Sequence, residues 1–216
     1  MIIDPASASP RDFYRALVSL ITPRPIAWVS TLSPQGIANL APFSFFNGVG
    51  ANPPTLLFCP VNNRHGQKKD TLRNVESTPE FVVNIVPFAL AQPMNDTSED
   101  LPYEVSEFEK VGIAMEPSSR VKPPRVKDSP IHLECVVHQI LNLGTGPLGA
   151  NVVIGRIVLI DIADSVLGPD GQIDPRKLDT IGRMGGSTYT RTTTLFDLAR
   201  PVGAEVLGGG TKKAPA

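Results

Sequence analysis

Residues 24–47 decide the fold: RPIAWVSTL (24–32) is followed, after a short turn, by IANLAPFSFFN (37–47). The first run is rich in β-branched and aromatic residues, which is typical of a strand. The turn sequence SPQG (33–36) has proline at its second position and glycine at its fourth, which favours a type I turn. We therefore predict an antiparallel β-hairpin.

Polar residues interrupt the second half of this hairpin. Asn39, Ser44 and Asn47 lie among bulky apolar side chains, and Pro42 is expected to remove a ladder donor. A plain core strand needs none of these. Short amides and hydroxyls between aromatic rings suit a wall against which a planar ligand with a polar rim lies. We predict that the hairpin carries a binding site.

Composition excludes several classes of protein. The chain has 216 residues, 41% of them hydrophobic, so it can bury a sizeable core. A formal net charge of -1 argues against a dedicated nucleic-acid binder. No run is long enough to span a bilayer and the start does not resemble a signal peptide, so we expect a cytoplasmic protein. Cys59 and Cys135 are far apart without metal spacing, which favours reduced core thiols over a disulfide or redox pair.

The remaining pattern predicts a mainly β protein with short helices. Six or seven strands favour a closed or nearly closed antiparallel barrel whose ends are covered by the helices. We expect one domain over 1–199 and a flexible tail over 200–216. Further strands are predicted over 55–59, 80–87, 131–143 and 151–166, the last bent or broken near Gly155. Helices are predicted over 10–21, from about 70, and over 88–95, 104–111 and 174–179, with turns over 48–54 and 168–171 and an extended arm over 118–130.

The segment 62–74 carries the strongest local charge. It changes from loop to helix near Asp70, with Lys69 or Asp70 as the N-cap, and it holds Arg64, Lys68 and Arg73. Unpaired amides and basic side chains at a helix start favour a phosphate. The alternative is a solvated helix start whose basic residues face water.

Two further patterns indicate no site. The sequence GTGPLG (144–149) matches G-x-G-x-x-G, but Pro147 and the following strand-like residues favour a hairpin loop. His132, Glu134 and His138 share one strand face and suggest a metal, but no further ligand stands at short spacing. We expect those three to form a solvated or interface side, opposite a core face, and we predict no metal site.

Several motifs resemble the flavin reductase-like, flavoredoxin-type family. They are RPIAWVST (24–31), NLAPFSFFN (39–47), KDTLRN (69–74) and the shorter runs 80–84, 133–135 and 183–186. The resemblance covers about 11–189 and implies an FMN-binding split β-barrel. It also implies a homodimer with flavin near the interface and electron transfer from NAD(P)H.

The resemblance also implies the site residues. Ser30 and Thr31 would lie at the isoalloxazine ring, and Ser44 and Asn47 would reach the ribityl or phosphate end. The phosphate would bind the turn at Lys69, Asp70 and Thr71, which agrees with the helix-start argument. The ring contacts and backbone amides would come from Ala41, Pro42, Phe43, Ser44 and Phe45, with Asn95 and Arg183 as further candidates.

The expected function is an NAD(P)H-dependent flavin reductase. Because flavin N5 accepts the hydride, the protein stacks the rings, and we assign no catalytic side chain. Its electrons would pass to an acceptor or a partner monooxygenase. One alternative is a flavoredoxin-like FMN electron carrier without useful NAD(P)H oxidation, and another is a structural or interaction barrel without flavin.

Overall fold

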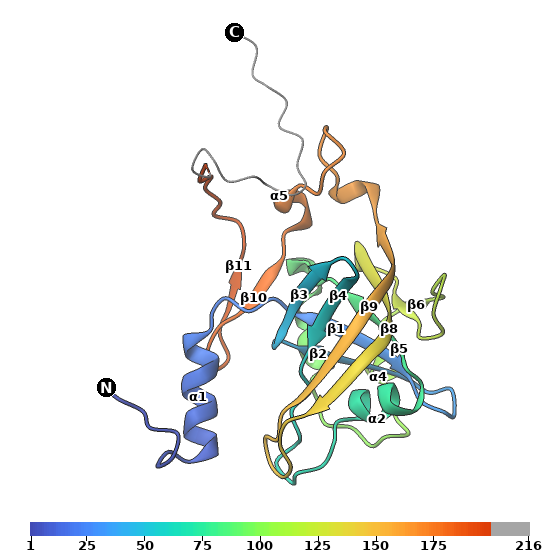
Figure 1. The fold of residues 1–216 in the computed structure, drawn as a ribbon. Coiled ribbons are helices and arrows are strands. Elements are labelled where there is room, and N and C mark those ends of the chain that lie inside the picture. Colours follow the sequence, from blue (N-terminus) through green and yellow to red (C-terminus); the bar gives the residue numbers. More distant parts are fainter. Residues whose placement is uncertain (200–216) are drawn as a thin grey trace.

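The computed structural model describes residues 1–199, which form a seven-stranded antiparallel sheet in the order β2-β1-β5-β8-β9-β4-β3 (Figure 1). Two small ribbons, β6–β7 and β10–β11, and short helices complete the fold. The strands are β1 Ala27–Leu32, β2 Ala38–Phe43, β3 Phe46–Ala51, β4 Pro54–Phe58, β5 Glu80–Asn84, β6 Met115–Glu116, β7 Arg125–Val126, β8 Ile131–Asn142, β9 Asn151–Ile162, β10 Ile181–Arg183 and β11 Tyr189–Arg191. The helices are α1 Pro10–Leu20, α2 Asp70–Ser77, α3 Ala91–Asp96, α4 Glu107–Val111 and α5 Pro175–Leu178, with short 3-10 turns η1 Phe88–Leu90 and η2 Asp164–Val166.

The predicted hairpin is confirmed. β1 pairs with β2 from Ala27 opposite Phe43 to Leu32 opposite Ala38, and the Gly36 amide donates to the Ser33 carbonyl at 2.9 Å to close the turn. β1 also pairs with β5 on its other side. The hairpin is therefore built into the sheet, with β2 as an edge strand.

Pro42 lies at the free edge of β2 and removes no ladder donor, contrary to the sequence-based expectation. The Leu40 amide points away from β1 and donates to Glu107 Oε2 at 2.9 Å. Amides of alternate residues in a strand point to the same side, so the missing N–H of Pro42 belongs to that outer row. Proline is tolerated at such an edge.

β1 is buried on both faces, which fixes the core. Val29 packs with Phe58 and Phe81 in one cluster, which α2 closes. Trp28 points to the opposite face, packs with residues of α3 and α4, and donates from Nε1 to Thr97 Oγ1 at 2.9 Å. The site therefore stands on a rigid central strand.

The sheet is not closed into a barrel, which corrects the expectation of a closed or nearly closed one. Its edges are β2 and β3, which follow each other in the chain but share no ladder among the described residues. Residues 44–45 form a bend between them. Phe43 and Phe46 pack against the same core cluster, so side chains cover the gap that the ladder leaves open.

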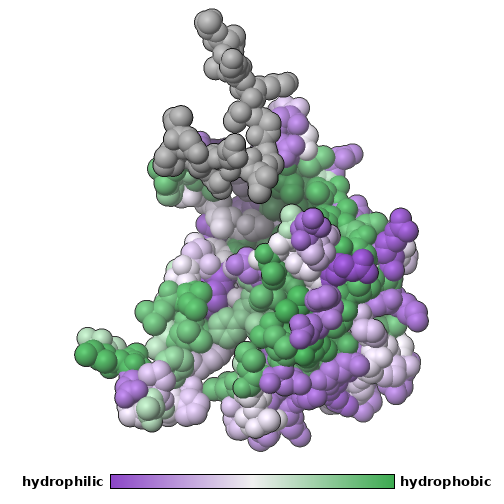
Figure 2. All heavy atoms as spheres, viewed as in Figure 1, coloured by the Kyte–Doolittle hydropathy of each residue, from purple (hydrophilic) through white to green (hydrophobic). Residues whose placement is uncertain are grey.

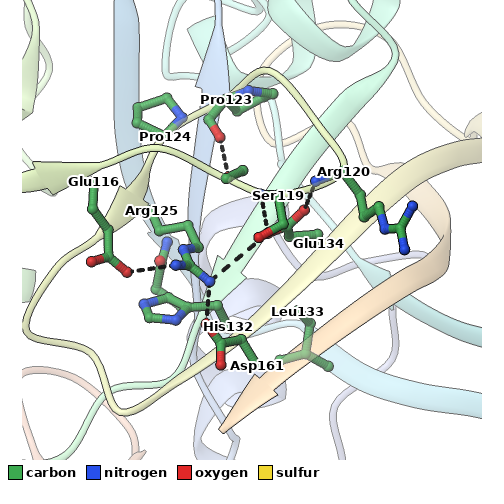
Figure 3. A network of polar contacts seen from close by, with 12 residues as sticks. Glu116, Ser119, Arg120, Pro123, Pro124, Arg125, His132, Leu133, Glu134 and Asp161 are labelled. Atoms are coloured by element: carbon green, nitrogen blue, oxygen red, sulfur yellow. Dashed lines mark hydrogen bonds and ion pairs between the residues drawn. The ribbon is translucent and has the colours of Figure 1, made fainter. Parts of the chain in front are cut away.

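The polar face of β8 was predicted wrongly as a solvated or interface side. His132 and Glu134 are 5% and 0% exposed, because the arm 118–130 lies over them (Figure 3). Glu134 accepts from the amides of Ser119 at 2.8 Å and Arg120 at 2.5 Å. His138 is exposed as expected. Within residues 1–199 no group of His, Cys, Asp and Glu side chains suits a metal.

Local predictions near the turns had mixed outcomes. The loop 144–149 joins β8 to β9 as a hairpin, as predicted, and no helix follows it. The turn expected over 48–54 was wrong, because most of it is the edge strand β3. β9 runs unbroken through Gly155, where a Cβ atom would lie 2.3 Å from the Phe81 ring.

The predicted tail lies outside the described residues, and none of the described helices has the length and apolarity to cross a membrane.

Candidate functional site

Two adjoining cavities follow the free edge of β2. The larger, of about 550 Å³, lies between α1, the end of β2 and the segment 183–189, and Figure 2 shows this face hollowed beside α1. The smaller, of about 100 Å³, lies against the start of α2. Pro42 and Ser98 line both, so the cavities adjoin, and we call the two together the groove. The volume of the larger is within the range of roughly 300–1,000 Å³ typical of small-molecule sites.

Backbone donors are available where β2 ends. Among the described residues, the amides of Ser44 and Phe45 donate no hydrogen bond. The Phe45 carbonyl accepts from the Cys59 amide at 2.8 Å, which fixes the bend. Unpaired amides require an acceptor, and Ser44 lines the larger cavity, so its amide is a donor for the polar rim of a ligand there.

Arg24 builds the wall of the larger cavity. Its buried guanidinium donates to the carbonyls of Ile21 at 2.7 Å and Met184 at 2.9 Å and to Ser44 Oγ at 3.2 Å. These bonds join α1, β2 and the segment 183–189. Burial lowers the pKa of Arg24, yet a guanidinium stays protonated in proteins. The larger cavity therefore has a fixed positive charge in its wall.

The start of α2 confirms the predicted helix boundary and leaves donors free. Lys69 is the N-cap, and no side chain caps the helix. The first intrahelical bond runs from the Arg73 amide to the Lys69 carbonyl at 3.1 Å, so the preceding amides have no helical partner. The helix dipole adds partial positive charge there. This end of the groove suits an anion.

Ion pairs surround that helix start. Lys69 pairs with Asp100, and Arg73 pairs with Asp70 at 3.1 Å. Burial raises the pKa of Asp70, against the lowering effect of Arg73. Exposed ion pairs of this kind are weak, about 0–1 kcal/mol, so an incoming phosphate can replace Asp100 as the partner of Lys69.

Glu107 is a site residue that sequence reasoning missed. It is 5% exposed, lines the smaller cavity and accepts from the Leu40 amide, and burial raises its pKa. Thr71 beside it accepts from Asn39 Nδ2 at 3.0 Å. Acidic residues are common at helix starts, so the sequence pattern does not distinguish Glu107 as a site residue. Only its buried contact with Leu40, 67 positions away in the chain, does so.

The structure brings most predicted site residues to the groove. Phe45 does not line it but lies with its ring centroid 6.2 Å from that of Tyr14, which does. The larger cavity is lined by Pro42, Ser44, Asn95 and Arg183. The smaller cavity is lined by Ala41, Pro42, Phe43, Lys69, Asp70 and Thr71.

Ser30, Thr31 and Asn47 lie outside both cavities. Ser30 Oγ donates to the Pro124 carbonyl at 2.5 Å, and Thr31 Oγ1 accepts from Asn74 Nδ2 at 3.0 Å, so both fully buried hydroxyls are used internally. Asn47 lies on the exposed strand β3. Their contact with a ligand stays a prediction. The arm and α2 cover β1, which hairpin periodicity cannot show.

The geometry is that of a β domain with a cavity of small-molecule size that adjoins an uncapped helix start. Residues 19–178 match the flavin reductase like domain. The chain is 40% identical over 178 residues to an uncharacterized protein of Aquifex aeolicus, covering 82% of this chain and 89% of that protein. It therefore belongs to the flavin reductase-like family.

Solved structures agree with this placement. Nitrilotriacetate monooxygenase component B from Bacillus cereus superimposes with a TM-score of 0.86 at 33% identity, over 92% of this chain and 98% of that one. The 2-nitrobenzoate 2-nitroreductase of Pseudomonas fluorescens gives 0.84 at 30% identity, over 96% and 100%. The family and these likenesses indicate a flavin-related oxidoreductase.

Proposed function

We propose that the protein binds FMN in the groove and acts as an NAD(P)H-dependent flavin reductase. The observation that carries this proposal is that the larger cavity at Ser44 adjoins the smaller cavity at the uncapped start of α2, with Pro42 and Ser98 lining both. A flavin mononucleotide has a planar ring with a polar rim at one end and a phosphate at the other. The groove offers free amides at one end and an anion site at the other.

The residues present fit each part of FMN. The ring would lie in the larger cavity, where Arg24 holds the wall and Pro42 presents an apolar surface at the edge. The phosphate would accept from the α2 amides and from Lys69. Ser30 and Thr31 would support the site from behind, by fixing the arm and α2.

The chain's own part in the reaction is to position and to stabilise charge. Bound FMN supplies a two-electron acceptor at N5 for a hydride from C4 of the reduced nicotinamide. The free amides of the bend and the positive wall of Arg24 stabilise negative charge that develops on a ring beside them. Asn95 and Arg183 line both the larger cavity and a neighbouring one, from which a second substrate would approach.

The onward acceptor is proposed from the likenesses. One similar structure is component B of a monooxygenase, and another is a nitroreductase. We propose that the electrons pass to an acceptor or to a partner monooxygenase of this kind.

Anaerobic mixing tests the reaction. The protein reconstituted with FMN is mixed with NADH and, separately, with NADPH while the flavin absorption band is followed. Rapid bleaching by either nucleotide is expected. Bleaching only by an external reduced carrier would support an electron carrier and reject the reductase, and a protein that does not bind FMN would reject both.

We also propose a homodimer that uses β3. This strand is an unpaired edge among the described residues, and its Val49 is 56% exposed. Figure 2 shows hydrophobic residues gathered over the sheet and α1 on the same side of the molecule. Unpaired apolar edges favour pairing with another chain. Analytical ultracentrifugation is expected to give twice the chain mass, with Val49→Lys shifting the protein towards monomer; a monomeric wild type would reject the proposal.

A further inference from the structure

Two asparagines and two threonines meet where α2 packs on β1 and β2. Thr31 on β1 lies opposite Asn39 on β2, and Thr71 and Asn74 lie about one turn apart on α2. In the order Thr31, Asn39, Thr71 and Asn74, the residues are 0%, 8%, 1% and 1% exposed. Polar groups as buried as these depend on one another for hydrogen bonds.

Each asparagine donates across this interface to the threonine on the opposite element. Asn39 Nδ2 lies 3.0 Å from Thr71 Oγ1, and Asn74 Nδ2 lies 3.0 Å from Thr31 Oγ1. The Asn74 amide is also held from behind, because its Oδ1 accepts from Tyr103 Oη at 2.7 Å. Both threonine oxygens act as acceptors in these bonds, so each hydroxyl keeps its own hydrogen.

The hydroxyl hydrogen of Thr71 is the one that a ligand can reach. Thr71 lines the smaller cavity, whereas Thr31 lines neither cavity of the groove. Within the described part of the chain, the Thr71 hydroxyl has no acceptor for its hydrogen. A hydroxyl that accepts from one side directs its hydrogen to another, so the bond from Asn39 leaves this hydrogen for an acceptor in the cavity.

The backbone at Thr71 suits the same acceptor. Thr71 is the second residue of α2, so its amide is among those without a helical partner. Lys69, the N-cap, lines the same cavity. A hydroxyl, an amide and an ammonium group at one helix start are donors for the oxygens of one phosphate.

We propose that Asn39 is a positioning residue for the flavin phosphate. Its amide holds the Thr71 oxygen as an acceptor, so the Thr71 hydroxyl donates to a phosphate oxygen at the start of α2. Without this bond the hydroxyl turns freely and binds the phosphate less well. The inference rests on the proposed function, because it takes the phosphate of FMN to lie in the smaller cavity.

A double-mutant cycle, measured by calorimetric titration of the flavin-free protein with FMN, tests this role. Thr71→Val keeps the shape of the side chain and removes its donor, so FMN affinity should fall about tenfold or more. Asn39→Ala should lower it about threefold or more alone, but less than about twofold in the Thr71→Val background. Asn142→Ala, at the exposed end of β8, is the control and should change nothing.

Riboflavin, which lacks the phosphate, gives a readout that a merely structural role would not move. Asn39→Ala should lower the affinity for FMN while the affinity for riboflavin changes less than about twofold. Asn39→Leu keeps the branched shape of the side chain without its donor. It replaces Asn39→Ala in both measurements if urea denaturation shows that the alanine variant does not fold.

The other outcomes overturn the inference. If Asn39→Ala weakens FMN binding equally in the presence and absence of the Thr71 hydroxyl, Asn39 acts without Thr71. An equal loss for FMN and riboflavin would show that Asn39 only supports the fold of the groove. No loss from Thr71→Val would show that this hydroxyl does not bind the phosphate. A wild type that does not bind FMN would reject the proposed function itself.

Discussion

The arm-covered face of β8 and the free edge of β2 are both rich in polar residues, yet they differ in what is left unpaired. On β8, Glu134 accepts from two arm amides, and Arg125 pairs with Glu116 at 2.9 Å and with Asp161, which leaves the buried Arg125 Nε as the one side-chain atom of this network without a partner within residues 1–199 (Figure 3). At the β2 edge, the amides of Ser44 and Phe45 and the first amides of α2 have no partner among the described residues. Polar residues that satisfy one another hold a fold, whereas unpaired donors beside a cavity mark a site.

The largest expected effect comes from breaking the polar network between β8 and the arm. Glu134→Gln removes a fully buried charge that accepts two amides and lies near Arg125, so we expect the free energy of unfolding to fall by about 3–5 kcal/mol. Urea denaturation measures it. Glu109→Gln, on the exposed side of α4, is the control and should change little. A loss below about 1 kcal/mol would mean that other contacts hold the arm.

A smaller effect is expected where donors are free for a ligand. Lys69→Ala removes a charged donor at the start of α2, and we expect FMN binding to weaken by about 1.5–3 kcal/mol. Unfolding should change by no more than about 1 kcal/mol, since the lost Asp100 pair is exposed. Calorimetry and urea denaturation separate the two effects, with Lys122→Ala as the control. Unchanged FMN affinity would show that the FMN phosphate does not bind at Lys69.

The stability of the protein is expected to depend on pH through His132, on the arm-covered face of β8. Burial lowers the pKa of His132, which bonds the Val126 carbonyl through Nε2 at 2.9 Å near Arg125, Glu116 and Asp161. His132 then binds a proton more readily in the unfolded chain than in the folded one. The free energy of unfolding therefore falls by about 1.4 kcal/mol for each pH unit below about 6.5, until the folded protein also binds the proton. His132→Gln should remove this loss, whereas His138→Gln on the exposed part of β8 should keep it. Parallel wild-type and His132→Gln stability curves from pH 7.5 to 5 would contradict the assignment.

The smallest expected effect concerns the free edge itself. Because Pro42 withholds an outward N–H, Pro42→Ala should leave the β1–β2 ladder intact and cost about 0.4–1 kcal/mol, mainly through a freer unfolded chain. Ala41→Pro is the matched contrast, because it removes an inward donor and should cost more. Urea denaturation compares them. Equal losses would show that the two positions do not differ in their pairing.

The sequence by itself determined the features that depend on neighbours in the chain. The turn at 33–36 and the start of α1, where Ser9 Oγ accepts from the Asp12 amide at 3.1 Å, follow from local turn and capping chemistry. The motifs of 24–47 and 69–74 also indicated the family, which the comparisons show. The part of the candidate groove that 41–44 and 69–71 form was predicted in the same way, whereas most of the lining from α1, 94–101 and 184–189 was not.

Only the tertiary structure decided which polar groups are free. Ser30 is bonded to Pro124, 94 positions away, and Glu107 reaches Leu40 across 67, and neither contact leaves a periodic signal. The same holds for the open edge between β2 and β3 and for the burial of Glu134. These outcomes depend on which distant segment covers a strand, and that is set by packing of the whole chain, not by residue pattern along it.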